Sequence, residues 1–354
     1  MRILIVENGF QDLRKSRKPL GNYFQSLGND VFYACPDSKE KSIHTIPMSR
    51  NSLAPIQLIN GCKRLINLET ENAIEAVLSF RFIPNVLNYL ASFHNGSTKR
   101  VAVITGLGYA FVSTNNSLKA ITQRKLIKLF YRIASKRVQL ITQNPDDLVD
   151  LGVDNGKFIL GSGVKKTNDT FENRLYTDSF NLLYVGRLLR SKGIFTAVEI
   201  FEQLQSNTRG VTLTIAGSID VGNPDSITEA ELSELINKKG VNFRGFVNDM
   251  DSVYKKCNVL LFPSTYREGV PRVILESLKY GLTIVTSDMP GCKETINDNG
   301  FLISRDTDIE GVIEYLSSLD SNKLKENQTK SKELFQSTFS TDVIYPQYLS
   351  YLLK

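Results

Sequence analysis

Residues 259–286 read VLLFPSTYREGVPRVILESLKYGLTIVT, and this stretch predicts a strand, a loop, a helix and a second strand in succession. Val259 to Phe262 are four consecutive apolar residues bounded by turn formers, which is typical of a buried strand. Pro271 suits the first position of a helix that we expect to end at Tyr280, because its missing N–H costs nothing there. Gly281 suits the left-handed residue that ends a helix, and Leu282–Thr286 predict the next strand. Val273, Ile274, Ser277 and Leu278 are the expected inner face of the helix. A strand–helix–strand unit indicates a parallel sheet.

Two glutamates of this stretch are candidate site residues. Glu268 falls in the predicted loop, and Glu276 falls inside the predicted helix among small or apolar residues. A carboxylate in such a place is costly to bury without partners. Two glutamates eight positions apart are also common by chance, so their meaning depends on a second motif.

That motif is LLYVGRLLRSKG, residues 182–193. It predicts a strand, a tight turn at Gly186 and a helix that begins near Gly193. Arg187 and Lys192 flank this turn, where the N–H groups and the dipole of the helix favour an anion. Arginine offers phosphate a planar fork, and lysine acts as a point charge. Alone, the two residues are equally typical of solvated cations at a helix start. The glutamates that follow in the same domain favour a phosphate site.

In this order the motifs resemble those of the retaining GT-B glycosyltransferases of family 4. The matching segments of the second half are Gly186-Arg187 with Lys192-Gly193, Ala216-Gly217, Phe243 to Phe246, Glu268 to Glu276, Pro290 to Glu294 and Asn299 to Leu302. The first half resembles a narrower branch, the enzymes that build bacterial O-antigen and capsular repeat units. The segments that carry this likeness are 104–111, 143–147 and 161–164.

The resemblance implies an α/β protein of the GT-B fold, with two Rossmann-like domains that face each other across a cleft. It implies that Arg187 and Lys192 hold the diphosphate of a nucleotide-sugar, most simply a UDP-sugar, and that Glu276 binds the ribose and Glu268 the transferred sugar. The expected donor-binding residues are Gly186, Gly217, Glu268, Gly269, Val270 and Glu276, and the expected catalytic residues are Glu268, Arg187 and Lys192. Family enzymes retain anomeric configuration and need no metal or other cofactor. The implied acceptor is a saccharide linked to a polyprenyl diphosphate.

On the acceptor side the expected residues are Thr105, Gly106 and Gly108. Many relatives carry a histidine where this chain has Thr105. A threonine cannot act as a base of the histidine type at neutral pH, so the catalytic group on the acceptor side stays open.

Apolar runs that alternate with helical segments predict two α/β domains, as expected for 354 residues. We expect a first domain over 1–168, a second over 169–340 and a last helix over 341–354 that crosses back to the first domain. The polar segment 165–179 is the expected linker. The predicted strands lie at 3–6, 31–34, 77–80, 101–104, 138–142, 158–160, 181–185, 211–216, 241–243, 259–262, 282–286 and 301–303.

Charge is divided unevenly between the two halves. Residues 1–168 carry 23 Lys and Arg against 12 Asp and Glu, although the whole chain has a net charge of only +6. Lys119 to Arg137 holds seven basic residues and no acid, with apolar residues at helical spacing. Such a helix can lie on an anionic membrane surface, and it can equally be a core-packing helix with a solvated basic face. No recognised nucleic-acid module is present, so we expect no nucleic acid partner.

The four cysteines lie far apart and predict reduced thiols rather than disulfides or a zinc site. No apolar run approaches the roughly 20 residues of a membrane span. We therefore expect a cytoplasmic protein that associates peripherally with the inner face of the membrane. Two alternatives to the transferase remain, a nucleotide-sugar epimerase of the same fold and a non-catalytic nucleotide-sugar-binding subunit.

Overall fold

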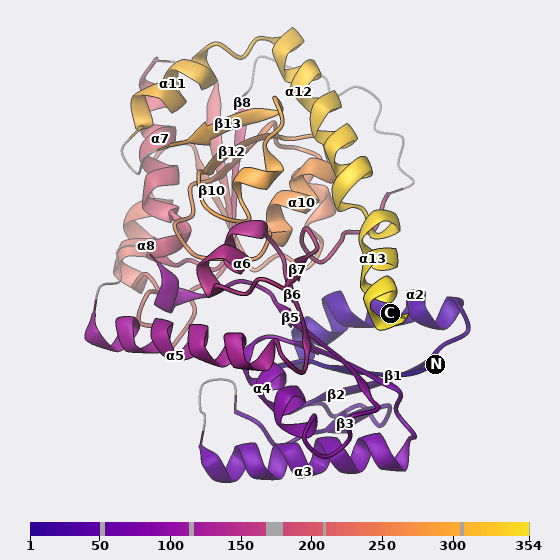
Figure 1. Ribbon diagram of the computed structural model, residues 1–354. Helices are drawn as coiled ribbons and strands as arrows, with labels where there is room; N and C mark the ends of the chain where they lie inside the picture. The colour runs from indigo at the N-terminus through magenta and orange to yellow at the C-terminus, as the bar shows by residue number, and fades with distance from the viewer. Residues whose placement is uncertain (50–53, 113–116, 168–179, 208–209, 305–307, 354) are drawn as a thin grey trace. The chain divides into compact units, whose positions relative to one another are not determined.

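The computed structural model describes residues 1–49, 54–112, 117–167, 180–207, 210–304 and 308–353, and the chain forms two compact units (Figure 1). Unit 1 comprises Met1–Phe111, Asn115–Ser162 and Asp342–Lys354. Unit 2 is formed mainly by Gly163–Thr341. Each unit is a parallel sheet covered by helices, so the α/β class predicted from the sequence is confirmed.

Unit 1 contains a seven-stranded sheet of order β3-β2-β1-β4-β5-β6-β7 in which every pairing is parallel. Its strands are β1 Arg2–Val6, β2 Asp30–Cys35, β3 Ile43–Thr45, β4 Ala76–Phe80, β5 Lys99–Ile104, β6 Gln139–Thr142 and β7 Lys157–Phe158. Its helices are α1 Phe10–Asp12, η1 Leu13–Arg17, α2 Lys18–Ser26, α3 Pro55–Glu71, α4 Phe82–Ala91, η2 Tyr109–Phe111, α5 Leu118–Ala134, α6 Pro145–Leu151 and α13 Thr341–Leu353. The central strands are continuously apolar because helices cover both faces of the sheet.

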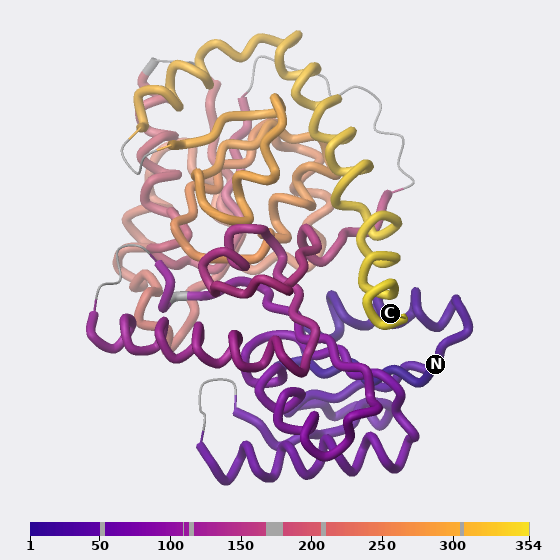
Figure 2. Tube along the Cα trace, in the orientation of Figure 1, coloured from indigo at the N-terminus to yellow at the C-terminus, as the bar shows by residue number. Residues whose placement is uncertain are grey.

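The last helix completes the core of unit 1. In Figure 2 the yellow end of the tube lies beside the indigo start of the chain, next to α2. Ile344, Tyr348 and Leu352 of α13 are buried in one cluster with Ile3 of β1 and Phe24 of α2. Segments from the two ends of the sequence therefore share one hydrophobic core.

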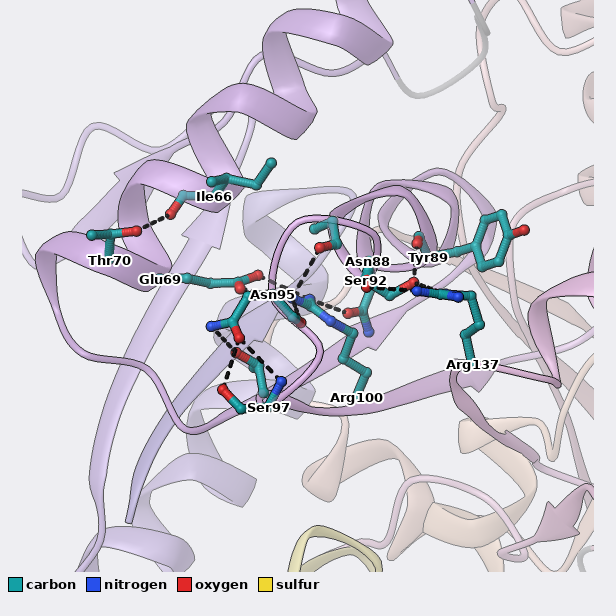
Figure 3. A network of polar contacts seen from close by, with 12 residues as sticks. Ile66, Glu69, Thr70, Asn88, Tyr89, Ser92, Asn95, Ser97, Arg100 and Arg137 are labelled. Carbon is teal, nitrogen blue, oxygen red and sulfur yellow. Dashed lines mark hydrogen bonds and ion pairs between the residues drawn. The ribbon is translucent and has the colours of Figure 1, made fainter.

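A buried ion pair joins α3 to β5 on the other side of the same sheet (Figure 3). Nη2 of Arg100 lies 2.7 Å from Oε2 of Glu69, and Nη1 donates to Oε1 at 2.9 Å. Nη1 of Arg100 also donates to Oδ1 of Asn88 on α4 at 3.1 Å. Both members of the pair are almost fully buried, so each depends on the other for compensation of its charge.

Unit 2 contains a six-stranded parallel sheet of order β10-β9-β8-β11-β12-β13. Its strands are β8 Phe180–Val185, β9 Val211–Ala216, β10 Val241–Gly245, β11 Val259–Phe262, β12 Thr283–Ser287 and β13 Gly300–Ile303. Its helices are η3 Arg190–Lys192, α7 Ile194–Asn207, α8 Glu229–Ile236, α9 Asp251–Tyr254, α10 Arg272–Lys279, η4 Lys293–Thr295, α11 Ile309–Ser317, α12 Ser321–Leu334 and η5 Phe335–Phe339. Helices α7, α8 and α11 bury their apolar residues in one cluster with the sheet, and α10 and α12 pack against β12.

The stretch that predicted the fold has two local differences from expectation. Pro271 is the N-cap residue of α10, with ψ 121°, and not its first helical residue. The residue preceding a helix is commonly extended, so the ring of proline fits there as well. Leu275 is buried on α10, whereas Val273 is only partly buried. Gly281 has φ 69°, the left-handed conformation expected at a helix end.

The predicted strands match the structure within a few residues, with one omission. Strand β3 was not predicted, because three residues at the edge of a sheet give too short a pattern to recognise. All four cysteines are free thiols. Among the described residues, no helix combines the length and the apolar character that a membrane span requires.

Candidate functional site

The predicted donor residues gather at the carboxyl edge of the sheet of unit 2. Gly186 follows β8 directly, and the loop that carries Glu268 follows β11. Strands β8 and β11 are neighbours in the sheet. Strands β9 and β10 come between them in the sequence, and they lie on the other side of β8 in the sheet. Strands β8 and β11 therefore flank the topological switch point, where doubly wound sheets bind their ligands.

Glycines let the loops at this edge approach one another closely. Gly193 has φ 77°, and a Cβ there would lie 2.1 Å from the carbonyl oxygen of Pro263. A Cβ on Gly217 would lie 1.9 Å from the carbonyl oxygen of Gly186. Larger residues are sterically excluded at these places, so the loop 186–193 is fixed by backbone packing against its neighbours.

Lys192 and Glu268 form the central ion pair of the site. Nζ of Lys192 lies 2.5 Å from Oε1 of Glu268, and the two side chains are 11% and 21% exposed. The ammonium also lies 5.5 Å from the ring centre of Phe262 and 5.9 Å from that of Tyr266, which are favourable cation–π distances. The lysine and the glutamate predicted from separate motifs are thus brought into contact.

Burial raises the pKa values of two titratable groups, Cys292 and Tyr184, on which the charge of Glu268 also acts. Burial, followed by the negative charge of Glu268, raises the pKa of the Cys292 thiol to about 12, and the charge of Lys192 opposes this shift. Burial also raises the pKa of Tyr184, to which Glu268 contributes in the same direction. Both groups remain neutral at ordinary pH, so the ammonium and carboxylate carry the charge here.

Glu276 is held in one orientation on the first turns of α10. Nε of Arg272 donates to its Oε1 at 2.8 Å, and the hydroxyl of Tyr254 donates to its Oε2 at 3.0 Å. Burial, followed by the charge of Glu276, raises the pKa of Tyr254 well above its ordinary value, so this hydroxyl stays a donor. Tyr254 also stacks on Tyr280 at 5.4 Å between ring centres. Protein donors therefore fix both oxygens of the Glu276 carboxylate.

Arg187 has a partner that the sequence did not identify. Its Nη1 lies 2.6 Å from Oδ2 of Asp220, which also accepts from Nδ2 of Asn223 at 2.9 Å. Half of the Arg187 side chain is exposed, so the guanidinium is accessible to a ligand. The loop that follows β9 also contacts the loop 186–193 through Asp225, whose carboxylate accepts from the backbone N–H and the hydroxyl of Ser191. The local sequence carried no signal for these contacts, because a carboxylate that faces another loop has the same sequence pattern as a solvated one.

The remaining predicted donor residues lie in the same loops. Val270 is buried. The backbone of Gly291 packs closely against Gly269, because a Cβ on Gly291 would lie 1.6 Å from the carbonyl oxygen of Gly269. The N–H of Gly186 donates to Ala216 at 3.0 Å, and that of Gly217 donates to Gly245 at 2.8 Å. These two N–H groups are therefore engaged in holding the loops together.

The predicted acceptor residues belong to unit 1. Thr105 follows β5 and is partly buried, and Gly106 and Gly108 have φ values of 116° and 76°. The N–H of Phe111 donates to Gly108 at 3.0 Å and closes a turn. Within the described part of the chain, no group of three or more His, Cys, Asp or Glu residues is placed to hold a metal ion.

Residues 165–333 match the family described as glycosyl transferases group 1. The capsular polysaccharide biosynthesis glycosyltransferase CapM of Staphylococcus aureus is 24% identical, over 92% of this chain and 90% of that protein. The N,N'-diacetylbacillosaminyl-diphospho-undecaprenol alpha-1,3-N-acetylgalactosaminyltransferase of Campylobacter jejuni is 22% identical, over 99% of this chain and 97% of that protein.

Solved structures show the same fold. A glycosyltransferase from Rickettsia africae superposes with a TM-score of 0.78 at 19% identity, over 100% of this chain and 98% of that one. Anabaena HepE, solved in complex with UDP, superposes with a TM-score of 0.77 at 17% identity, over 99% of both chains. The GT-B fold that the sequence predicted is thereby confirmed.

Proposed function

We propose that this chain transfers a sugar from a nucleotide-sugar to a lipid-linked saccharide in the synthesis of a bacterial surface polysaccharide, because residues 165–333 match the family described as glycosyl transferases group 1. The donor we propose is a UDP-sugar. The names of the two relatives, one of capsule biosynthesis and one that acts on a diphospho-undecaprenol saccharide, support the pathway and the acceptor class.

The observation that carries the proposal is the contact between Lys192 and Glu268 at the switch point of the unit 2 sheet. A mostly buried ammonium beside a strand-to-helix turn is suited to a diphosphate, and Arg187 adds an accessible guanidinium to the same loop. A carboxylate beside the ammonium is suited to the hydroxyls of a sugar. The adjacent positions of the two charges match the adjacent diphosphate and sugar of a nucleotide-sugar.

The chemistry assigned to these residues is electrostatic. As the bond between the sugar carbon and the diphosphate oxygen breaks, negative charge develops on the diphosphate, and Lys192 and Arg187 stabilise it. Glu268 positions the transferred sugar, and Glu276 accepts hydrogen bonds from the ribose hydroxyls. In a retaining reaction the acceptor oxygen bonds to the same face of that carbon. Its proton passes to an oxygen of the leaving diphosphate, so the step requires neither a histidine nor a metal ion.

A donor screen tests the proposal. The purified chain is incubated with UDP-, GDP- and dTDP-sugars and a short polyprenyl-diphosphate-sugar, and the products are separated by mass. Transfer supports the proposal, and NMR of the new linkage reads its anomeric configuration. Interconversion of the free nucleotide-sugar would instead identify an epimerase, and binding without turnover would identify a non-catalytic subunit.

Thr105 is proposed to bind the acceptor or a phosphate through its hydroxyl. The test is Thr105→Val, which keeps the shape of the side chain and removes the hydroxyl. If turnover falls while UDP binding is unchanged, Thr105 has a direct part in transfer. Full turnover in this variant would remove Thr105 from the site.

We assign peripheral membrane association to α5. Leu126, Leu129 and Ile133 of this helix are exposed, and Lys125 and Arg132 are exposed beside them. The exposed apolar and basic side chains on one helix suit the apolar and anionic layers of a lipid surface, with about 1 kcal/mol for each basic residue near the membrane. We propose on this basis that the chain acts at the inner face of the cell membrane, where a lipid-linked acceptor is found.

Liposome co-sedimentation tests this assignment. The chain is expected to bind vesicles that contain phosphatidylglycerol at low salt and to bind neutral vesicles less. Leu129→Asp is expected to reduce binding, whereas Val221→Asp, at an exposed apolar residue of unit 2, serves as the matched control. Absence of binding to the anionic vesicles would contradict a role of α5 at the membrane.

A further inference from the structure

A second cluster of charged residues lies at the carboxyl edge of the unit 1 sheet. Glu7 and Asn8 directly follow β1, and Arg81 directly follows β4. Strands β1 and β4 are neighbours, with β2 and β3 on the far side of β1, so they flank the switch point of this sheet. Unit 1 therefore places polar side chains where a doubly wound sheet binds a ligand, as unit 2 does.

Glu7 is the centre of the cluster, and its side chain is fully buried. Its Oε2 accepts from Nε of Arg17 at 2.8 Å, and its Oε1 accepts from the N–H of Asn8 at 2.8 Å. Nε of Arg81 lies 3.5 Å from the same Oε1. Asn8 and Arg81 thus converge on one carboxylate oxygen from two different strands.

Arg81 is held in an unusual backbone conformation. Its φ is 72°, a left-handed conformation that is rare for a residue with a long side chain and strains the backbone. Nη2 of Arg81 lies 2.8 Å from Oδ2 of Asp12, and a third of the arginine side chain is exposed. Arg17, which supports Glu7, ends a π-helical turn at Leu13–Arg17, a form found frequently at functional sites. Two irregular backbone segments therefore aim side chains at one point.

Asn8 supplies an independent indication of a ligand. Its side chain is only 7% exposed, and its Oδ1 is buried without a hydrogen-bond partner among the described residues. An unsatisfied buried amide oxygen destabilises the fold, because it has lost its hydrogen bonds to water without replacement. Such a cost at a switch point is explained when the partner is a donor on a bound molecule.

The charges of the cluster identify the class of that molecule. The two carboxylates of Glu7 and Asp12 balance the two guanidinium groups of Arg17 and Arg81, so the cluster has no net charge with which to attract an anion. It offers the amide oxygen of Asn8 as acceptor, and the guanidinium of Arg81 and the carboxylate of Asp12, each about one third exposed, as donor and acceptor. This set suits adjacent hydroxyl groups, each of which both donates and accepts.

We propose that Asn8 and Arg81 form a saccharide subsite of unit 1, in which Asn8 accepts from one hydroxyl of a neutral sugar and Arg81 donates to another. Glu7 and Asp12 are positioning residues for the arginine. This assignment rests on the proposed function, in which the subsite binds the sugar of the lipid-linked acceptor. Its residues are different from those proposed to hold the donor.

Steady-state kinetics of three variants test the subsite, with the acceptor and the donor varied separately. Asn8→Ala is expected to raise the acceptor KM about fivefold, as for the loss of one neutral hydrogen bond, and to leave the donor KM within twofold. Arg81→Gly is expected to raise the acceptor KM at least as much, because the guanidinium is lost. Glycine is chosen because it adopts the positive φ of residue 81 without strain. Asn155→Ala is the control, since Asn155 precedes β7 at the opposite edge of the sheet.

Stability separates a binding role from a structural one. Removal of an unsatisfied oxygen is expected to leave the melting temperature of Asn8→Ala equal to that of the wild type or higher. An unchanged acceptor KM in both Asn8→Ala and Arg81→Gly would overturn the subsite, and so would a rise that the donor KM shares equally.

A wild-type chain that transfers no sugar would count against the proposed function and not against the subsite. Saturation-transfer NMR with free N-acetylglucosamine at millimolar concentration then provides the test. A signal in the wild type that is weakened in Asn8→Ala supports the subsite. Equal signals in the two proteins, or none in the wild type, would overturn it.

Discussion

Replacement of Lys192 by alanine is expected to reduce kcat by a factor of one hundred to one thousand. The ammonium is mostly buried, and it lies 2.5 Å from Glu268 at the switch point. A unit charge about 4 Å from it, in surroundings of effective dielectric constant about 20, interacts by about 4 kcal/mol. Only part of a unit charge develops on the leaving diphosphate, so the stabilisation lost in the variant is smaller, about 2.7–4 kcal/mol. This loss corresponds to a rate that is roughly a hundredfold to a thousandfold lower.

The assay compares initial rates of sugar transfer with UDP affinity from calorimetry. Lys238→Ala is the matched control, because Nζ of Lys238 lies 2.6 Å from Glu202 in the same unit but the pair is exposed. Such surface pairs contribute about 0–1 kcal/mol, so this variant is expected to transfer sugar at the wild-type rate. Melting temperatures of both variants show whether unit 2 remains folded.

The double variant Lys192→Ala with Glu268→Ala tests whether the two residues act as a pair. Because they are in contact, their effects are expected to add to less than the sum of the single changes. A kcat of Lys192→Ala within twofold of the wild type, in a folded protein, would refute the assignment of the diphosphate to this loop.

Three further outcomes follow from the structure. Arg100→Met is expected to lower the free energy of unfolding by about 3–5 kcal/mol, because it leaves the carboxylate of Glu69 buried without its cation; urea unfolding measures this, and a loss below about 1 kcal/mol would contradict it. Gly291→Ala is expected to lower both the melting temperature and UDP affinity, since its Cβ would overlap a carbonyl oxygen, whereas Gly96→Ala, with open space around it, is expected to change neither. The backbone N–H of Thr228 and the side chain of Arg190 lower the pKa of Glu231 from 4.5 to about 2, so its stabilising contribution is present above about pH 4.5 and is lost as the pH falls toward 2. Melting curves of the wild type and Glu231→Gln between pH 2.5 and 6 should therefore converge at the acid end, and a constant difference would contradict this.

The parallel α/β organisation was predictable because its strands are buried on both faces and appear as short apolar runs. The run Val259–Phe262 has the same bounds in the sequence prediction and in the structure. Strand β3 escaped prediction because Ile43–Thr45 offers only three residues at an edge. Pro271 was misplaced by one position because the first helical residue and the residue before it both tolerate a fixed φ near −63°.

The candidate site was predictable only where charge and glycine occur in one local segment. Lys192 and Glu268 each stood out beside a strand-to-helix turn, and their contact follows from the adjacency of β8 and β11. Asp220 and Arg81 did not stand out, because nothing in the local sequence distinguishes a charge that faces a partner on another loop from a solvated one. The positive φ of Arg81 in particular depends on the tertiary structure around it.

The position of α13 in the core of unit 1 has a consequence for protein synthesis. Ile344, Tyr348 and Leu352 fill the same cluster as Ile3, so a nascent chain cannot complete that core until residue 352 has left the ribosome. The whole of unit 2 is made in between, which at about 5–20 residues per second occupies roughly 10 to 40 s. During this interval the apolar face that α13 will cover is open to solvent. Unit 2 can therefore reach its native fold first, and unit 1 depends until then on whatever keeps its unfinished core from aggregating.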